Sequence, residues 1–372
     1  MKTEGRNMWY TGIVKKIIFV IGIILLMSGV LQLIFEYVPK EITLEQSDEM
    51  GNYGNHAQGN YLLLTSGNGV WSMPFIFGSR LYLYDIEKDK MYLLWNQKGI
   101  LQEFGAKMCF NGENVLAFGG RGMGGDPSDA TIVKLDGEKK KIAIEPTSCI
   151  SLKQNVIYYT GRICENGEQF YDVIWEKDII SGEQKKLLQR PEYSIESFKI
   201  MNERLFAIDE NIGCLVIKNL STGTANNHQF SDNTNPAYII PKDENSVIII
   251  GIGEKYQCKV IEYQFEKDKE RIVTLLGADG ETPNYWLWDN GKYKNGYLYC
   301  NDVSDNIARI DIKTGKTEVL ISANQLGTER NDYCHAEYCQ DYIAVEVYHN
   351  YAKTLYIFDY EGAFIRKKTL HQ

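Results

Sequence analysis

The sequence predicts an all-β protein: a seven-bladed β-propeller preceded by one N-terminal transmembrane helix. Three observations predict this class. A strand phrase recurs along the chain, turn residues occupy matching places in successive repeats, and one apolar run stands near the N-terminus. Six or eight blades remain possible because the first repeat lacks an obvious innermost strand. Residues 42–44 (Ile-Thr-Leu) could supply that strand, or could close the ring by pairing in the last blade.

The recurring phrase is a polar turn followed by a short apolar and aromatic strand. Aligned on the first apolar residue after the turn, the second strands of seven repeats begin at Tyr61, Val115, Val156, Leu205, Val247, Tyr297 and Ile343. By subtraction these positions are 41 to 54 residues apart, close to the period of about 40–50 residues of four-stranded propeller blades. The turns of a β-helix are much shorter, so the spacing disfavours that fold. A β-sandwich is the other alternative.

A second series of turns supports the repeat. Apolar strands end at Asp, Asn or Gly in residues 310–315 (Ile-Asp-Ile-Lys-Thr-Gly) and 358–362 (Phe-Asp-Tyr-Glu-Gly). These residue types tolerate the left-handed backbone of a tight turn. Composition agrees, because Tyr is abundant at 25 and Pro scarce at 8, and aromatic residues fit a pleated, half-buried surface.

The D-x-x-T/S-G turn after an apolar strand, spread over roughly residues 57–370, resembles extracytoplasmic bacterial β-propellers of the TolB/YVTN-like repeat type. WD dipeptides and kelch double-glycine pairs do not recur regularly. The resemblance implies the propeller fold, with binding or scaffolding as its usual role and no particular ligand.

Residues 17–35 form an uncharged run of 19 residues, long enough to cross a hydrocarbon core of about 30 Å as a helix. Four basic residues precede it, and five acidic residues against one Lys follow within residues 36–50. The positive-inside rule therefore predicts a cytoplasmic tail (1–16), a signal-anchor helix (17–35), a linker (36–55) and an extracytoplasmic propeller domain (56–372) at the cell membrane. A cleaved signal peptide is the alternative, but no small-x-small site stands near residue 35.

The net charge and the cysteine spacing limit which partners, disulfides and metals we expect. The net charge of −9 disfavours nucleic acid, which binds to a basic face. Eight cysteines in an exported domain invite disulfides, with Cys334 and Cys339 as the most favourable local pair. The alternative, which we favour, is that most cysteines are small buried apolar residues. Neither a C-x₂-C pair nor His at ligand spacing is present, so we expect no metal and no cofactor.

Propeller topology predicts which loops share a face. Connections between the second and third strands lie at the same end of the ring as connections between blades, and we call this end the loop face. Loops on a rigid scaffold usually carry function. We therefore expect ligand-binding residues here, and the candidates are Trp71, Arg121, Arg162, Trp286 and Asp302.

Each candidate also has a structural alternative. Trp71, in the loop 66–79, could form a recognition platform or cover the first blade. Arg121 stands among five glycines in residues 119–130, and it could bind a carboxylate. This segment lacks the Lys and the helix of a phosphate-binding loop. A surface loop is therefore the simpler interpretation. Trp286 faces either the channel mouth or the neighbouring blade. Asp302 stands in an acidic loop that could bind calcium but lacks the order of a calcium loop, so turn chemistry explains it better. Arg162 is expected in the third of these loops.

No H-E-x-x-H or G-x-S-x-G motif is present. Our first hypothesis is a membrane-anchored module that binds or scaffolds a protein, peptide or glycan at the cell envelope. The second is a propeller enzyme (a lyase, cyclase or hydrolase) that uses acidic residues and His335 at the channel mouth. A structural subunit of an envelope complex is the third.

Overall fold

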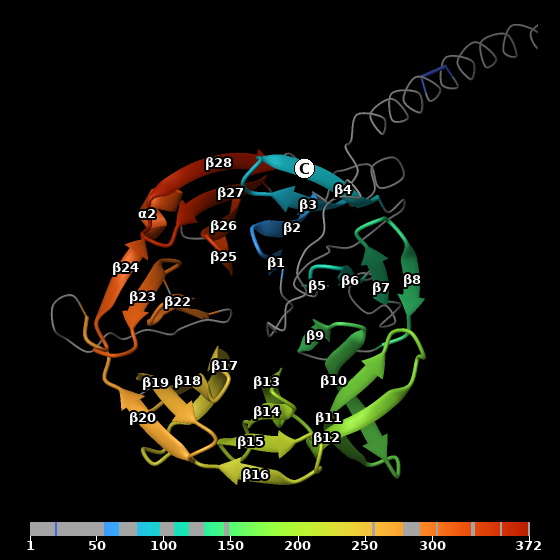
Figure 1. The fold of residues 1–372 in the computed structure, drawn as a ribbon, viewed down its shortest axis with the longest axis vertical. Helices are drawn as coiled ribbons and strands as arrows, with labels where there is room; N and C mark the ends of the chain where they lie inside the picture. The colour runs from blue at the N-terminus through green and yellow to red at the C-terminus, as the bar shows by residue number, and fades with distance from the viewer. Residues whose placement is uncertain are drawn as a thin grey trace, which may run out of the picture.

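The computed structural model describes residues 19–20, 56–66, 80–96, 108–118, 130–144, 149–254, 257–277, 291–302, 304–328, 332–349 and 352–370. Within these ranges, seven four-stranded antiparallel sheets stand around a common centre, each with its first strand innermost and its fourth strand at the rim (Figure 1). Each sheet is a blade, numbered in chain order. The seven-bladed β-propeller predicted from the sequence is confirmed.

The strands of blades 1 to 4, from the centre outwards, are β1 (Ala57–Gln58), β2 (Tyr61–Ser66), β3 (Arg80–Asp85) and β4 (Lys90–Asn96); β5 (Met108–Phe110), β6 (Asn114–Phe118), β7 (Ala130–Lys134) and β8 (Lys139–Ile142); β9 (Ile150–Lys153), β10 (Val156–Glu165), β11 (Gln169–Asp178) and β12 (Gln184–Pro191); and β13 (Ile195–Met201), β14 (Arg204–Asp209), β15 (Cys214–Asn219) and β16 (Ala225–His228). Those of blades 5 to 7 are β17 (Asn235–Asp243), β18 (Ser246–Ile252), β19 (Cys258–Gln264) and β20 (Lys269–Val273); β21 (Lys292–Lys294), β22 (Tyr297–Asn301), β23 (Ile307–Asp311) and β24 (Thr317–Ile321); and β25 (Tyr333–Tyr338), β26 (Tyr342–His349), β27 (Ala352–Asp359) and β28 (Phe364–Leu370). A short helix, α2 (Ala323–Leu326), precedes blade 7.

The predicted second strands agree with the structure. β2, β6, β10, β14, β18, β22 and β26 each begin at the predicted residue or one residue earlier. The innermost strand of blade 1, which the sequence left open, is the two-residue β1, and residues 42–44 lie outside the described ranges.

Turn chemistry places the outer hairpins as expected. The Asp311 carboxylate accepts hydrogen bonds from the backbone N–H groups of Lys313 (2.8 Å) and Thr314 (3.1 Å). Gly315 follows at φ 75°, a left-handed conformation that glycine adopts without a Cβ penalty. A related arrangement stands at Asp359, whose carboxylate accepts from the backbone N–H groups of Glu361 (3.0 Å) and Ala363 (2.8 Å), with Gly362 at φ 81°. An Asp side chain that mimics the turn backbone therefore defines each of these hairpins.

The core lies between blades. Each of the seven apolar clusters joins one blade to the next, including one between blade 7 and blade 1. Alternate residues of a central strand face opposite neighbours, so both faces of every blade are buried. Burial of this apolar surface is the main force that holds the blades together.

Backbone and side-chain contacts close the ring where blade 7 meets blade 1, and the Gln340 backbone N–H donates to the Gly59 carbonyl oxygen (2.7 Å). In the described part of the chain, blade 1 is built only from N-terminal strands and blade 7 only from C-terminal strands. The Asn60 amide donates to the Asp341 carboxylate (2.9 Å) and accepts from the Asp341 backbone N–H (2.9 Å). The Arg366 guanidinium donates to the carbonyl oxygen of Ile86 (2.7 Å). Closure therefore depends on backbone and side-chain hydrogen bonds and on the shared apolar cluster.

The alternative disulfide between Cys334 and Cys339 is not formed, because no disulfide links any of the eight cysteines. Cys334 packs between blades 6 and 7, whereas Cys339 packs between blades 7 and 1. The two thiols therefore stand on opposite sides of one blade. Burial raises the pKa of Cys334 to about 12. Seven of the eight are buried and Cys164 is exposed, which confirms the alternative of small buried apolar residues.

The predicted membrane span at residues 17–35 lies outside the described residues, apart from the helical and exposed Phe19 and Val20. No helix in the described ranges is long and apolar enough to cross a membrane.

Candidate functional site

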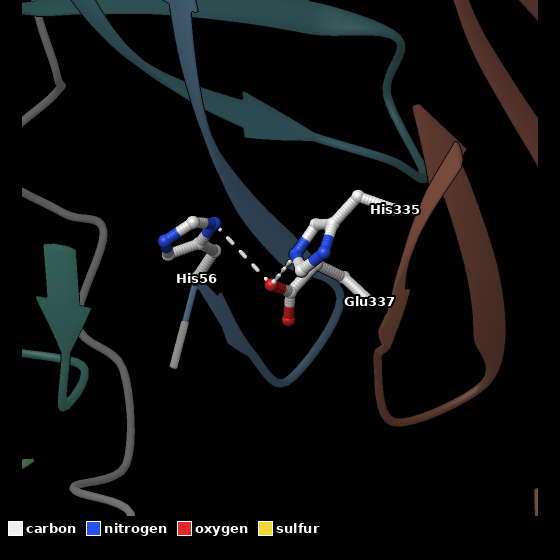
Figure 2. Close-up of side chains that lie close together, drawn as sticks. All are labelled: His56, His335 and Glu337. Carbon is white, nitrogen blue, oxygen red and sulfur yellow. Dashed lines mark hydrogen bonds and ion pairs between the residues drawn. The ribbon is translucent and has the colours of Figure 1, made fainter. Parts of the chain in front are cut away.

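Two histidines and one glutamate meet at the centre of the ring. Figure 2 shows His56, next to β1 of blade 1, and His335 and Glu337, both on β25 of blade 7, converging on one point. Glu337 Oε1 stands 2.8 Å from His335 Nε2 and 3.3 Å from His56 Nδ1. The two imidazole centroids are 5.7 Å apart. We call these three residues the central triad.

Strand alternation places two of the three triad residues. In β25, Cys334, Ala336 and Tyr338 pack into the apolar cluster between blades 6 and 7. His335 and Glu337 alternate with them and therefore project to the other face. His56 reaches the same point because its carbonyl oxygen accepts a hydrogen bond from the Leu63 backbone N–H (2.8 Å).

The triad is largely withdrawn from solvent: the side chains of His56, His335 and Glu337 are 13%, 21% and 7% exposed. Burial lowers the pKa of His56, and the charge of Glu337 only partly opposes this effect. Burial also disfavours the charged form of His335, but the hydrogen bond to Glu337 outweighs it, so the pKa of His335 is raised. The two imidazoles thus have opposite protonation preferences.

A buried ion pair stands behind the triad. His335 lies opposite Glu346 in the β25–β26 register. The Glu346 carboxylate pairs with the Lys353 ammonium and accepts a hydrogen bond from the Tyr348 hydroxyl (2.7 Å). Burial would raise the pKa of Glu346, but Lys353 more than compensates, so its pKa is lowered and it stays ionised. Two imidazole nitrogens and a carboxylate at one point can exchange protons or bind a cation.

Arg162 belongs to a second cluster, on the loop face of blade 3. It lies in strand β10, not in the loop where the sequence placed it. The ladder between β10 and β11 continues to Glu165 and Gln169, so the loop contracts to three residues. The Arg162 guanidinium lies 3.4 Å from the Asp172 carboxylate and 3.2 Å from that of Glu192.

The Arg162 guanidinium also stacks over the Tyr193 ring, with 4.4 Å between the guanidinium carbon and the ring centroid. Tyr193, in the connection between blades 3 and 4, has φ 60° and is 67% exposed. It is the one aromatic residue with positive φ among the described residues. Phe170 and Ile212 are also exposed. The Phe170 carbonyl oxygen accepts a hydrogen bond from the Glu192 backbone N–H (3.2 Å), and the side chain of Asn211, which precedes Ile212, donates to the Glu192 carbonyl oxygen (3.3 Å). We call Arg162, Phe170, Tyr193 and Ile212 the blade 3–4 patch.

Asp302 performs the turn role that the sequence also allowed. Its buried carboxylate accepts hydrogen bonds from the backbone N–H groups of Ser304 (2.7 Å) and Asn306 (3.0 Å) and from the Asn306 amide (2.8 Å). Asn306 in turn accepts from the backbone N–H of Ala323 (2.8 Å), at the start of α2. The other three predicted site residues, Trp71, Arg121 and Trp286, lie outside the described residues.

Sequence reasoning found His335 as a possible active-site residue but missed its partners. His56 and His335 are separated by 279 positions (335 − 56), and no short motif joins them. One signal was present: His335 and Glu337 follow the i, i+2 spacing of one strand face in the predicted seventh blade. The approach of His56 depends on ring closure, which one repeat cannot reveal.

Comparison with known proteins supports the fold. No family model matches the chain, and no curated protein matches it. Among solved structures, an oligogalacturonate lyase in complex with manganese aligns with a TM-score of 0.57 at 10% identity, over 86% of this chain and 90% of that one. The β-propeller domain of the trilobed protease from Pyrococcus furiosus aligns with a TM-score of 0.55 at 11% identity, over 89% and 98%.

An acylaminoacyl peptidase from Pyrococcus horikoshii aligns with a TM-score of 0.55 at 13% identity, over 84% of this chain but only 51% of the peptidase, so this chain spans about half its length. TolB from Acinetobacter baumannii matches with a TM-score of 0.41, too low to distinguish the TolB type from other propellers. The fold and the site thus define a seven-bladed β-propeller that carries a His-His-Glu triad at its centre and an aromatic and cationic patch on its loop face.

Proposed function

We propose that this chain is a membrane-anchored propeller outside the cytoplasm that binds a protein or peptide of the cell envelope, or a glycan, on its loop face. The charge asymmetry around residues 17–35 supports the anchor and its orientation. The rigid ring supports binding, because side chains on a fixed scaffold lose little conformational freedom when a partner docks.

The observation that carries this proposal is the blade 3–4 patch. Tyr193 presents most of its ring to solvent from a left-handed backbone, a conformation that costs a non-glycine residue about 1–3 kcal/mol and tends to occur at functional sites. Arg162 is held over that ring by Asp172 and Glu192. Tyr and Arg are the residue types enriched at the energetic centres of protein interfaces.

The patch favours a partner that offers an apolar or aromatic group flanked by a carboxylate. The exposed side chains of Phe170, Tyr193 and Ile212 can cover the apolar group. Arg162 already has two acidic neighbours, so a carboxylate of the partner would compete with Glu192 for its outer N–H groups. The residues Trp71, Arg121, Trp286 and Asp302 stay part of the proposed loop-face site.

The test is crosslinking and pull-down of the full-length protein from its native membrane, comparing wild type with Tyr193→Ala and Arg162→Ala. Ile180→Ala is the matched control, because Ile180 belongs to the same blade, is 71% exposed and lies in the β11–β12 turn at the opposite end of the ring. We expect a stoichiometric partner whose yield falls at least tenfold in both patch variants and is unchanged in the control. Equal recovery with all four proteins would reject the patch as the binding site.

The central triad favours a second function, a propeller enzyme with its active site at the ring centre. A carboxylate between two imidazoles with opposite pKa shifts has the parts of an acid–base pair. Acidic oligosaccharides and blocked peptides are suitable substrates for a screen. Turnover that is lost in Glu337→Gln but kept in His228→Ala would support the enzyme. Equal turnover in the two variants would exclude the triad as its active site.

A further inference from the structure

The central triad has the donor set of a transition-metal site. His56 and His335 each offer an imidazole nitrogen and Glu337 a carboxylate oxygen, and one such atom from each residue lies within 4.8 Å of the others. Imidazole with carboxylate suits zinc and its neighbours in the first transition row, whereas calcium and magnesium prefer shells of oxygen alone.

Two of the three ligand-atom separations lie near the spacing that one shared ion requires, and the third lies within 4.8 Å. Two ligand atoms bound at about 2.1 Å in tetrahedral geometry stand about 3.4 Å apart. His56 Nδ1 and Glu337 Oε1 are 3.3 Å apart, and His335 Nε2 and Glu337 Oε1 are 2.8 Å apart. A displacement of the Glu337 carboxylate oxygen by a few tenths of an ångström would bring both separations closer to this spacing.

A second observation points to a ligand. His56 Nε2 is buried, yet it has no hydrogen-bond partner among the described residues. Buried polar nitrogens are nearly always satisfied. The Glu346 carboxylate behind the triad is already paired with Lys353, so the Glu337 carboxylate is the one that contacts both imidazoles.

We propose that His56, His335 and Glu337 bind one divalent transition-metal ion, with Zn²⁺ as the best-fitting species, and that this ion ties blade 1 to blade 7. His56 comes from the first blade and the other two ligands from the last, so the ion would join the ring at the place where these two blades meet. Three protein ligands would leave a fourth position open to water or to a carboxylate or hydroxyl group of a ligand.

The expected consequence is ring stabilisation. An ion that binds the folded ring but not the unfolded chain raises the unfolding temperature in proportion to the logarithm of its concentration above Kd. His56 lies 279 positions before His335 in the sequence, so an unfolded chain cannot present all three ligands together. Loss of one ligand should abolish the shift without removing the apolar closure cluster.

The test uses full-length protein stripped with a chelator and titrated calorimetrically with Zn²⁺, and in parallel with Mn²⁺ and Ca²⁺. The variants are His335→Ala and Glu337→Gln. His228→Ala is the control, because His228 also pairs with two carboxylates, of Asp268 (3.0 Å) and Glu270 (3.2 Å), but lies at the rim strand β16. Thermal unfolding is followed for each protein with and without ion.

For wild type we expect one Zn²⁺ per chain, weaker binding of Mn²⁺, no binding of Ca²⁺, and an unfolding temperature that Zn²⁺ raises. In both ligand variants the Zn²⁺ affinity should fall at least tenfold. In the control it should be unchanged. Glu337→Gln preserves shape, so it keeps the test valid if His335→Ala does not fold. Absence of one-to-one Zn²⁺ binding in wild type, or equal affinity in Glu337→Gln and wild type, would overturn the proposal. Neither result depends on partner capture by the blade 3–4 patch.

Discussion

Two glycines in the same turn motif should respond very differently to one added methyl group. Gly223 and Gly315 each close a hairpin between the third and fourth strands, at φ 77° and 75°. A Cβ on Gly223 would meet nothing within 4 Å, whereas a Cβ on Gly315 would lie 1.8 Å from the carbonyl oxygen of Thr274. Gly223→Ala and Gly315→Ala therefore separate backbone strain from steric exclusion.

The strain is common to both variants and is about 1–2 kcal/mol, the cost of a left-handed conformation for a residue with a Cβ. At Gly315 the backbone of Thr274 must also retreat. That movement would break the bonds from the Leu276 N–H to the Gly315 carbonyl (2.8 Å) and from the Thr317 N–H to the Leu276 carbonyl (2.8 Å). Each is worth about 1 kcal/mol, and overpacking adds about 1–3 kcal/mol. We expect about 4–7 kcal/mol for Gly315→Ala against about 1–2 kcal/mol for Gly223→Ala.

The assay is equilibrium urea unfolding followed by tryptophan fluorescence, with calorimetric unfolding temperatures as the second readout. Gly182→Ala serves as a further control, because its φ is 76° and its added Cβ would also meet open space. Equal destabilisation in all three variants would refute the reasoning, since it would show that the connection between blades 5 and 6 does not press against the Gly315 turn.

Three further predictions follow from buried groups. Burial favours the neutral form of Glu262, but Lys242 and Arg271 outweigh burial and lower the pKa of its carboxyl. The stabilisation from this carboxylate is therefore present above the ordinary pKa of 4.5 and is lost as the pH falls through the lowered pKa. Wild type should lose more stability than Glu262→Gln in that pH window, and parallel pH profiles of the two proteins would contradict this. Lys353→Met should destabilise the protein by about 3–5 kcal/mol because it leaves Glu346 buried without its cation, and the double variant with Glu346→Leu should recover most of the loss in urea unfolding; no recovery would argue against the ion pair. A thiol reagent should label only Cys164 in the native protein and all eight cysteines after unfolding, and oxidised pairs seen by mass spectrometry would disprove the all-thiol state.

The sequence by itself determined the architecture. Its repeated strand starts, from Tyr61 to the seventh repeat, agree with the structure to within one residue, because turn chemistry and alternation are local and recur in every blade. The roles of Asp311 and Asp359 were readable for the same reason: an Asp side chain that bonds two or three residues ahead needs no distant partner.

Only the tertiary structure decided the site. The central triad requires that the two ends of the ring meet, which brings His56 to His335 and Glu337 across almost the whole chain. The tertiary structure also excluded the alternative disulfide: Cys334 and Cys339 are close in sequence, but their side chains enter different interblade clusters. Local periodicity fixes which face of a strand a residue occupies, whereas the closing of the ring fixes what that face meets.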